Sequence, residues 1–187
     1  MGTDMMSARA VLITLTLAMG LSSAVAEPQE LGAFNDWRVF RTTDKIGTVC
    51  FALSEPTSKK PAGVKRGEIY FMVSSWPSEK VSGEPSIVPG YPYKEQEKAV
   101  VEIGTDRFEF YTQNNAKEDG GDGGAWMKDT KEEEQLLAAM KKGSKMVVKG
   151  TSRRGTKTTD EYSLKGISAA LDKLASECGR PVADSRQ

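Results

Sequence analysis

The sequence predicts a mostly β protein, either an antiparallel β-sandwich or a partly closed barrel, with two peripheral helices, the second of them C-terminal. Two observations support this prediction. Short segments with alternating or continuous apolar residues recur along the chain between turn residues, and only two segments have the apolar periodicity of a helix. The clearest predicted strands span residues 37–41, 48–53, 68–75, 98–103, 107–112, 145–151 and 158–164.

The first strands differ in their apolar patterns. Residues 37–41 alternate between apolar and polar, whereas residues 69–73 are five consecutive apolar residues. A continuous apolar run indicates a central strand that is covered on both faces. Between them, residues 54–67 contain prolines, glycines and basic residues, so we expect a solvated loop there.

The next segment, residues 77–93, contains four prolines. Because proline has no N–H to donate to a β-ladder, we expect at most an edge strand, at residues 85–88. Two strands then follow as the clearest hairpin of the sequence. Their apolar residues alternate with glutamates, and residues 104–106 supply a Gly-Thr-Asp turn.

Two helices are predicted in the C-terminal third. The first opens with a capping box of Thr130 and Glu133, has lysines in its last turn and stops at Gly143. The second spans about residues 167–178. Its apolar positions recur at i, i+4, i+7 and i+11, and they are Ile167, Leu171, Leu174 and Cys178. This stripe directs Cys178 toward the body of the protein.

The first 26 residues have the layout of a secretory signal. Arg9 precedes an apolar run at residues 10–21, and Ala24-Val25-Ala26 matches the small-residue pattern of a cleavage site. The run is shorter than the roughly 20 residues that span a bilayer. We therefore expect a cleavable signal peptide at 1–26. The remaining residues, 27–187, are expected to form a single β-rich domain, with a frayed tail after about 179, in the periplasm or outside the cell.

The composition argues against several classes of function. The 26 basic residues equal the 26 acidic ones, so there is no basic excess that would favour nucleic acid. No stretch after residue 21 is apolar enough for a membrane-spanning helix. The chain has no histidine, which removes Ser-His-Asp and Cys-His catalysis and the commonest zinc ligand. We expect no enzymatic activity, no cofactor and no metal.

The two cysteines, Cys50 and Cys178, both belong to the part that we expect to be exported. In an oxidising compartment, an isolated pair favours a disulfide over a metal site or a redox motif. The alternative is two unpaired buried thiols.

Several segments together resemble one family. They are Val49-Cys50-Phe51-Ala52-Leu53-Ser54, Gly90-Tyr91-Pro92, Ala125-Trp126, Met140-Lys141-Lys142-Gly143 and, most specifically, Thr-Ser-x-x-Gly-Thr-x-Thr-Thr-Asp-x-Tyr-Ser-Leu at 151–164. With them, nearly all of the chain after the signal resembles the invasion-associated locus B family of exported bacterial proteins. Many members carry a second cysteine pair in mid-domain, and its absence here places this chain in a divergent branch. The resemblance implies an envelope-associated protein of alphaproteobacterial type, linked by name to host-cell invasion, with no catalytic residue to transfer.

Two polar groups offer candidate chemistry. Glu118, Asp119 and Asp122 could supply oxygen ligands to Ca²⁺, but they lack EF-hand spacing, so a solvated loop is favoured. Ser152 and its hydroxyl neighbours could supply a nucleophile, with Lys157 as the base in the absence of histidine. A strand with an outward Ser/Thr face explains the same residues and is favoured.

Two further groups offer candidate binding surfaces. Trp37, Trp76 and Trp126 could form an aromatic surface for a partner, although packing in a β core is the favoured interpretation. The basic residues of the 54–67 loop could contact an anionic polymer, although a solubilising loop is favoured. These basic residues are Lys59, Lys60, Lys65 and Arg66.

The leading functional hypothesis is a non-catalytic binding or structural module of the cell envelope, with an unknown envelope or host protein as its partner. The alternatives are a histidine-free hydrolase that uses a Ser/Thr hydroxyl with lysine, and an accessory subunit of another exported protein.

Cleavage of the signal peptide can be tested directly. We expect the mature chain to begin at Glu27, because Ala24-Val25-Ala26 follows the apolar run. N-terminal sequencing of the protein from the periplasm or the medium measures this. An intact N-terminus in the membrane fraction would contradict it.

Overall fold

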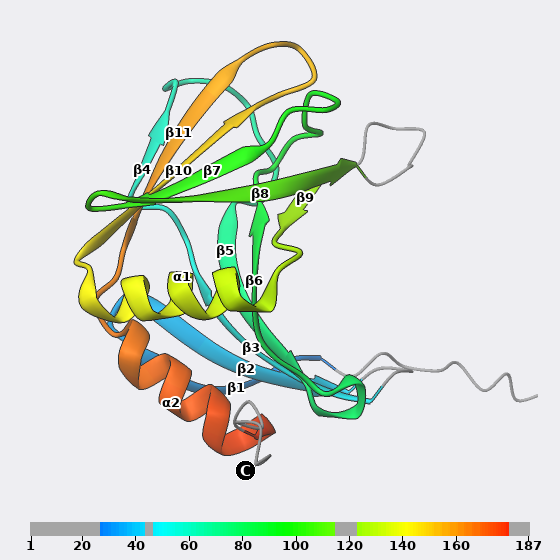
Figure 1. Cartoon of the computed structure of the whole chain (residues 1–187), viewed down its shortest axis with the longest axis vertical. Helices are drawn as coiled ribbons and strands as arrows, with labels where there is room; N and C mark the ends of the chain where they lie inside the picture. The colour runs from blue at the N-terminus through cyan, green and yellow to red at the C-terminus, as the bar shows by residue number, and fades with distance from the viewer. Residues whose placement is uncertain (1–26, 44–46, 115–122, 180–187) are drawn as a thin grey trace, which may run out of the picture.

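The computed structural model describes residues 27–43, 47–114 and 123–179. In these ranges eleven strands form one antiparallel sheet that does not close on itself, accompanied by two α-helices (Figure 1). The strand order along the sheet is β1-β2-β3-β5-β6-β9-β8-β7-β10-β11-β4. The predicted mostly β, antiparallel fold class with two helices is confirmed.

The bounds of the elements follow the chain. The strands are β1 (Gln29–Phe34), β2 (Trp37–Thr43), β3 (Thr48–Ser54), β4 (Ser58–Lys60), β5 (Tyr70–Trp76), β6 (Val81–Val88), β7 (Ala99–Ile103), β8 (Asp106–Asn114), β9 (Gly123–Trp126), β10 (Lys145–Thr151) and β11 (Lys157–Ser163). The helices are η1 (Pro77–Glu79), a single 3₁₀ turn, and the α-helices α1 (Thr130–Lys142) and α2 (Ile167–Cys178).

The sheet curls around an aromatic cluster centred on Phe71 of β5. The Phe71 ring makes edge-to-face contacts with Trp37, Phe110 and Tyr162, at centroid distances of 6.3, 6.1 and 6.2 Å. The three partners come from β2, β8 and β11, and all four side chains are fully buried. Contacts between strands so far apart in the sheet require it to fold back on itself.

Strands near the two ends of the open sheet approach each other at Trp37. Its indole N–H donates a hydrogen bond to the backbone oxygen of Ser163, 126 positions later, at 3.0 Å. Nearby, Gly166 has a φ of 90° and lies so close to Phe34 that an added Cβ would stand 1.9 Å from the Phe34 oxygen. Only glycine fits this close approach between the β1–β2 turn and the start of α2.

Both α-helices pack against the curled sheet. Helix α1 contacts β6, β8 and α2, whereas α2 contacts β1, β2, β3 and β5. In Figure 1, α1 lies between the half of the sheet with β4, β11, β10 and β7 and the half with β1, β2 and β3. The predicted apolar stripe of α2 is buried, because Ile167, Leu171, Leu174 and Cys178 all face the sheet together with Ala170.

The predicted N-cap of α1 is wrong by one residue. Asp129, not Thr130, is the N-cap, and its carboxylate accepts a hydrogen bond from the Glu132 N–H at 3.0 Å. Aspartate is the stronger N-cap of the two, and the extended backbone at Asp129 places its carboxylate over the first turn. Thr130 is therefore the first helical residue.

The predicted edge strand at 85–88 is also wrong, because β6 is longer and lies inside the sheet. It pairs with β5 along its length and with β9 at Ser86 and Ile87. Pro85 is tolerated because the ladder with β9 covers only Ser86 and Ile87 and does not reach it. Three strands were missed. β4 lies within the predicted 54–67 loop and pairs with β11, and β1 precedes the first predicted strand. β9 lies between β6 and β8 in the sheet and pairs with both.

Three predictions fall outside the described residues. They concern the signal peptide at 1–26, the tail after 179 and the acidic loop with Glu118, Asp119 and Asp122. In the part of the chain that the structure describes, neither α-helix has the length and apolar content needed to cross a membrane.

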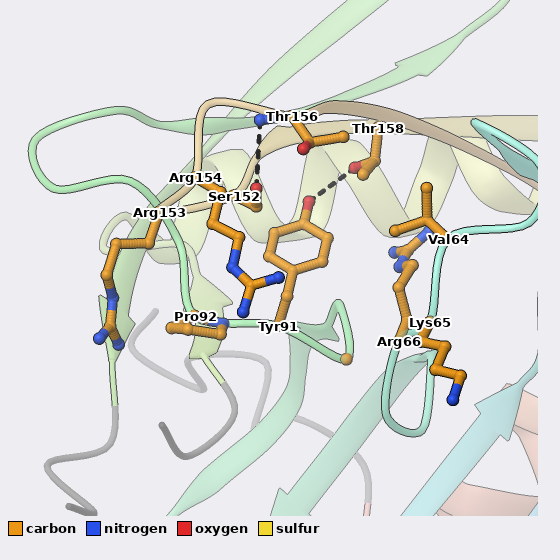
Figure 2. A pocket seen from close by; sticks show the side chains of 11 residues that line it. Val64, Lys65, Arg66, Tyr91, Pro92, Ser152, Arg153, Arg154, Thr156 and Thr158 are labelled. Atoms are coloured by element: carbon orange, nitrogen blue, oxygen red, sulfur yellow. Dashed lines mark hydrogen bonds between the residues drawn. The ribbon is translucent and has the colours of Figure 1, made fainter. Parts of the chain in front are cut away.

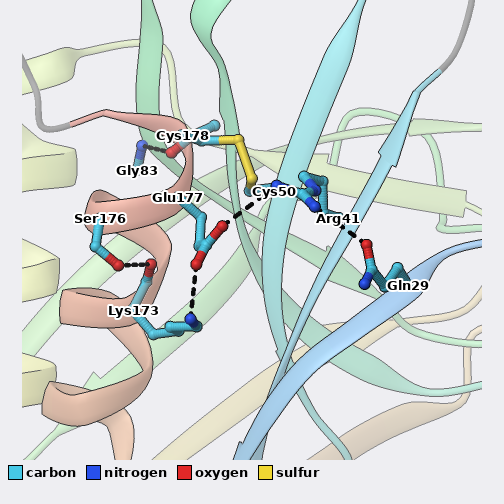
Figure 3. The surroundings of a disulfide bond; sticks show 9 residues. Gln29, Arg41, Cys50, Gly83, Lys173, Ser176, Glu177 and Cys178 are labelled. Carbon is cyan, nitrogen blue, oxygen red and sulfur yellow. Dashed lines mark hydrogen bonds and ion pairs between the residues drawn. A yellow bond between two sulfur atoms is a disulfide. The ribbon is translucent and has the colours of Figure 1, made fainter.

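The structure joins Cys50 of β3 to Cys178 of α2 in a disulfide, as the sequence predicts (Figure 3). The two Cα atoms are 5.9 Å apart, and the described residues contain no free cysteine. Beside the bond, Glu177 accepts hydrogen bonds from Lys173 at 2.6 Å and from Arg41 of β2 at 3.3 Å. The end of α2 is thus attached to two neighbouring strands.

The disulfide should contribute substantially to stability, because it closes a loop of 128 residues. We expect Cys50→Ala/Cys178→Ala to lower the free energy of unfolding by about 2–4 kcal/mol. Urea denaturation measures this loss, and reduced wild-type protein should match the variant. Two free thiols in denatured, unreduced protein from the periplasm would contradict the pairing.

Candidate functional site

A pocket of about 360 Å³ opens where three segments of the chain converge (Figure 2). Residues 64–66 follow β4, residues 90–92 follow β6, and residues 152–158 form the β10–β11 turn and the start of β11. The lining residues are Val64, Lys65, Arg66, Gly90, Tyr91, Pro92, Ser152, Arg153, Arg154, Thr156 and Thr158.

Backbone hydrogen bonds hold the three segments together. The Gly67 N–H donates to the Gly90 oxygen at 2.8 Å, and the Arg153 N–H donates to the Pro92 oxygen at 2.8 Å. Gly90 has a φ of 72°, and a Cβ there would stand 2.7 Å from the Gly67 oxygen. Glycine is therefore required where the two segments touch, and the position of the pocket wall is fixed by the backbone.

Tyr91 forms the inner wall of the pocket. Its hydroxyl lies 2.6 Å from the Thr158 hydroxyl, which in turn lies 3.4 Å from the Gly150 oxygen. Because Thr158 donates to that carbonyl oxygen, Tyr91 donates to Thr158, and both hydroxyl protons are engaged within the protein. Burial raises the pKa of Tyr91 above its ordinary value, so this hydroxyl stays protonated at neutral pH.

Arg66 connects the pocket to the protein interior through a buried ion pair. Its guanidinium donates to both carboxylate oxygens of Asp160, at 2.7 and 2.6 Å, and to the Pro89 oxygen at 2.9 and 2.7 Å. Only 5% of the Arg66 side chain and 4% of the Asp160 side chain are exposed. Burial would lower the pKa of Arg66, but the hydrogen bonds and charge of Asp160 outweigh it and raise this pKa.

Arg66 also stacks on Tyr91, with its guanidinium carbon 5.0 Å from the ring centroid. With its donors directed to Asp160 and Pro89, this arginine holds Tyr91 in place. The pair therefore has a positioning role at the pocket.

The other three basic residues at the pocket are exposed. Lys65, Arg153 and Arg154 make no ion pair with any residue in the described ranges. No acidic residue of the described ranges lines the pocket, although the whole chain has no net formal charge. Positive charge is thus concentrated at this opening.

The hydrolase residues do not form a catalytic pair here. The Ser152 hydroxyl oxygen accepts a hydrogen bond from the Thr156 N–H at 3.2 Å, which stabilises the β10–β11 turn. Lys157 is exposed on β11 and does not line the pocket. Ser152 therefore acts in this structure as a turn residue.

The prediction that this strand has an outward Ser/Thr face is wrong at Thr158. Thr158 points inward together with Asp160 and Tyr162, and all three are at most 4% exposed. They face inward because β-strand side chains alternate and the inward set includes Tyr162, which belongs to the aromatic core. Arg66 and Tyr91 satisfy the two polar members.

The three tryptophans do not gather on one surface. Trp37 is fully buried, whereas Trp76 and Trp126 are half-buried. Trp76 pairs with Val81 at one end of β6, and Trp126 is paired with Ser86, five residues along the same strand. The geometry of Trp37 is that of a core residue.

The basic residues of the predicted 54–67 loop are divided between two places. Lys59 and Lys60 belong to β4, while Lys65 and Arg66 line the pocket.

Sequence reasoning missed Tyr91, Arg153 and Arg154 as site residues. The signal that could have found them is the family motif itself, since Gly-Tyr-Pro and Thr-Ser-x-x-Gly-Thr supply much of the pocket wall. Within the described ranges, no group of three metal-ligating residues is present.

The buried ion pair leads to a stability prediction. Asp160→Asn leaves the Arg66 charge buried without its partner, so we expect the free energy of unfolding to fall by about 3–5 kcal/mol. Glu161→Gln is a matched control on the same strand. Its partner Lys145 is exposed and lies 3.6 Å away, so the expected loss is below about 1 kcal/mol. Urea denaturation compares the two, and equal losses would contradict the role of the pair.

Comparison with known proteins agrees with this fold. The crystal structure of invasion associated protein b from Bartonella henselae is similar to it with a TM-score of 0.55 and 13% sequence identity, covering 81% of this chain and 98% of that one. No curated protein matches the sequence significantly. The model of the invasion associated locus B (IalB) protein family matches residues 37–175. This match covers most of the chain, including β2 through most of α2 and the whole pocket, and the chain therefore belongs to the IalB family.

Proposed function

We propose that this protein is a non-catalytic binding module of the cell envelope, located in the periplasm or secreted, and that the cationic pocket is its binding site. The observation that supports this most strongly is the pocket itself. Exposed arginine and lysine side chains from two segments converge there with hydroxyl groups around an aromatic wall from the third, and two of the three segments carry family motifs. Such a concave site with a few convergent polar groups is typical of ligand binding.

Export is supported by two independent features. The Cys50–Cys178 disulfide requires an oxidising compartment to persist, and the first 26 residues have the layout of a cleavable signal. On this proposal, residues 27–187 act as a single binding domain. The partner is an envelope component or a host molecule, and no residue of the pocket performs covalent chemistry.

The alternative, a hydrolase based on Ser152 and Lys157, has less support. A nucleophilic hydroxyl needs a base within roughly 2.6–3.2 Å, and the base needs a third group to orient it. Ser152 has a backbone N–H as its hydrogen-bond partner instead, and Lys157 lies outside the lining. Binding without turnover is the simpler use of this arrangement.

The proposal is tested with the purified mature chain and an envelope extract of the source cells. We expect saturable, reversible binding of a component that is recovered with unchanged mass. Lys157→Ala should bind as the wild type does, because Lys157 does not line the pocket. In Ser152→Ala the recovered component should still have an unchanged mass, because Ser152 lacks the partners of a nucleophile. Thr156→Trp, which fills the pocket, should abolish binding.

Two outcomes would contradict the proposal. One is a bound component recovered in a cleaved form, with cleavage lost in Ser152→Ala while circular dichroism shows an unchanged fold. That result would favour the hydrolase. The other is undiminished binding by Thr156→Trp, which would place the binding site elsewhere.

A further inference from the structure

We propose that the cationic pocket binds a phosphate monoester, with Arg154 as the main contact to the phosphoryl group. This inference rests on the proposed binding function and specifies the chemical class of its ligand. It follows from the kinds of donors at the opening, their charge and the shape of the wall between them.

The accessible polar groups of the pocket are mainly hydrogen-bond donors. Lys65, Arg153 and Arg154 can only donate. The Ser152 oxygen accepts from the Thr156 N–H, which leaves the Ser152 hydroxyl proton free to donate outward. Because the described residues of the lining include no carboxylate, a ligand that carries several acceptor oxygens satisfies these donors without repulsion from them.

The charge of the site favours phosphate over carboxylate. Asp160 neutralises Arg66, but no described acidic side chain pairs with Lys65, Arg153 or Arg154. A carboxylate would neutralise one of these three charges. A phosphate monoester carries about −1.5 to −2 charges at pH 7 and presents three strong acceptor oxygens, so it matches the site more closely.

The positions of the side chains indicate the role of each. Figure 2 shows the Arg154 guanidinium turned toward Tyr91 and Pro92, while Arg153 and Lys65 extend to either side of the opening. In the same view, the Tyr91 ring lies between Arg154 and Arg66, and Arg66 is already held by Asp160. Arg154 is therefore placed for direct contact, and Arg153 and Lys65 supply attraction from the rim.

The wall beside these donors suits the organic part of a small ester. Tyr91, Pro92 and Val64 offer apolar surface, and about 360 Å³ accommodates a phosphoryl group with a ring of sugar size. The positive charge is local, since the chain as a whole is neutral. A local charge of this kind fits one phosphoryl group better than a long anionic polymer, which requires an extended basic surface.

The inference is tested by calorimetric titration of the mature chain at low ionic strength with glucose 6-phosphate, glucuronate and glucose. We expect measurable binding of glucose 6-phosphate, weaker binding of glucuronate and none of glucose. In Arg154→Gln, the affinity for glucose 6-phosphate should fall about tenfold or more, because a charge-assisted hydrogen bond is lost. Lys142→Gln makes the same change of charge at the exposed end of α1 and should leave the affinity within about twofold.

A second arm distinguishes the source of the phosphate. Vesicles of phosphatidylcholine, with and without phosphatidic acid, present a phosphate monoester on a membrane. Sedimentation with phosphatidic acid vesicles that is lost in Arg154→Gln would identify a lipid headgroup. Binding of glucose 6-phosphate without sedimentation would identify a soluble ester or a glycan phosphate. Either result supports the inference.

Three results would overturn it. These are an absence of binding to both glucose 6-phosphate and phosphatidic acid vesicles, an affinity for glucuronate equal to that for glucose 6-phosphate, or equal effects of Arg154→Gln and Lys142→Gln in proteins with unchanged circular dichroism. The envelope-extract assay separates this failure from that of the proposed function. If Thr156→Trp abolishes binding of the extract component while phosphate esters do not bind, the pocket is a binding site for another ligand class.

Discussion

Burial of the aromatic cluster around Phe71 is the constraint on which the rest of this structure depends. Trp37, Phe110 and Tyr162 reach Phe71 from three other strands, so the sheet must curl until β2, β8 and β11 surround β5. Removing large aromatic side chains from water is strongly favourable, and edge-to-face geometry adds to it. The hydrogen bond from Trp37 to Ser163 then fixes how far the curl proceeds.

The same curl creates the pocket, because one strand takes part in both. The inward residues of β11 are Tyr162, Asp160 and Thr158, and they lie at successive positions of the two-residue repeat. Tyr162 packs in the core, Asp160 pairs with Arg66, and Thr158 bonds to Tyr91. The inward face of β11 therefore passes from the apolar core through the buried ion pair to the pocket wall. Because all three belong to one strand, the packing of the core determines where the pocket wall lies.

The Arg66–Asp160 pair is better understood as a positioning device than as a source of stability. Transferring two charges from water costs free energy, and their attraction repays this cost only when the remaining donors are also satisfied. Here Pro89 accepts the other hydrogen bonds of Arg66, which fixes the guanidinium under the Tyr91 ring. With Arg66 neutralised, the exposed arginines and Lys65 are left to determine the electrostatics of the opening.

The sequence by itself determined the features whose causes lie close together in the chain. The hairpin of β7 and β8 follows from two-residue alternation around a short turn, and α2 follows from an apolar stripe of helical period. The disulfide followed from the count of cysteines and the expectation of export. Two segments that carry the family resemblance, residues 90–92 and 151–164, contain most of the residues that line the pocket.

Only the tertiary structure decided the features that depend on distant partners. β4 is three residues long and has no apolar pattern, so its pairing with β11 cannot be read locally. The inward orientation of Thr158 and Asp160 was missed because polar side chains on a strand usually face water. Their hydrogen-bond partners, Tyr91 and Arg66, are 67 and 94 positions away in the sequence. The pocket exists because three loops converge on the end of β11. A convergence of this kind is set by the curl of the whole sheet, which no single segment encodes.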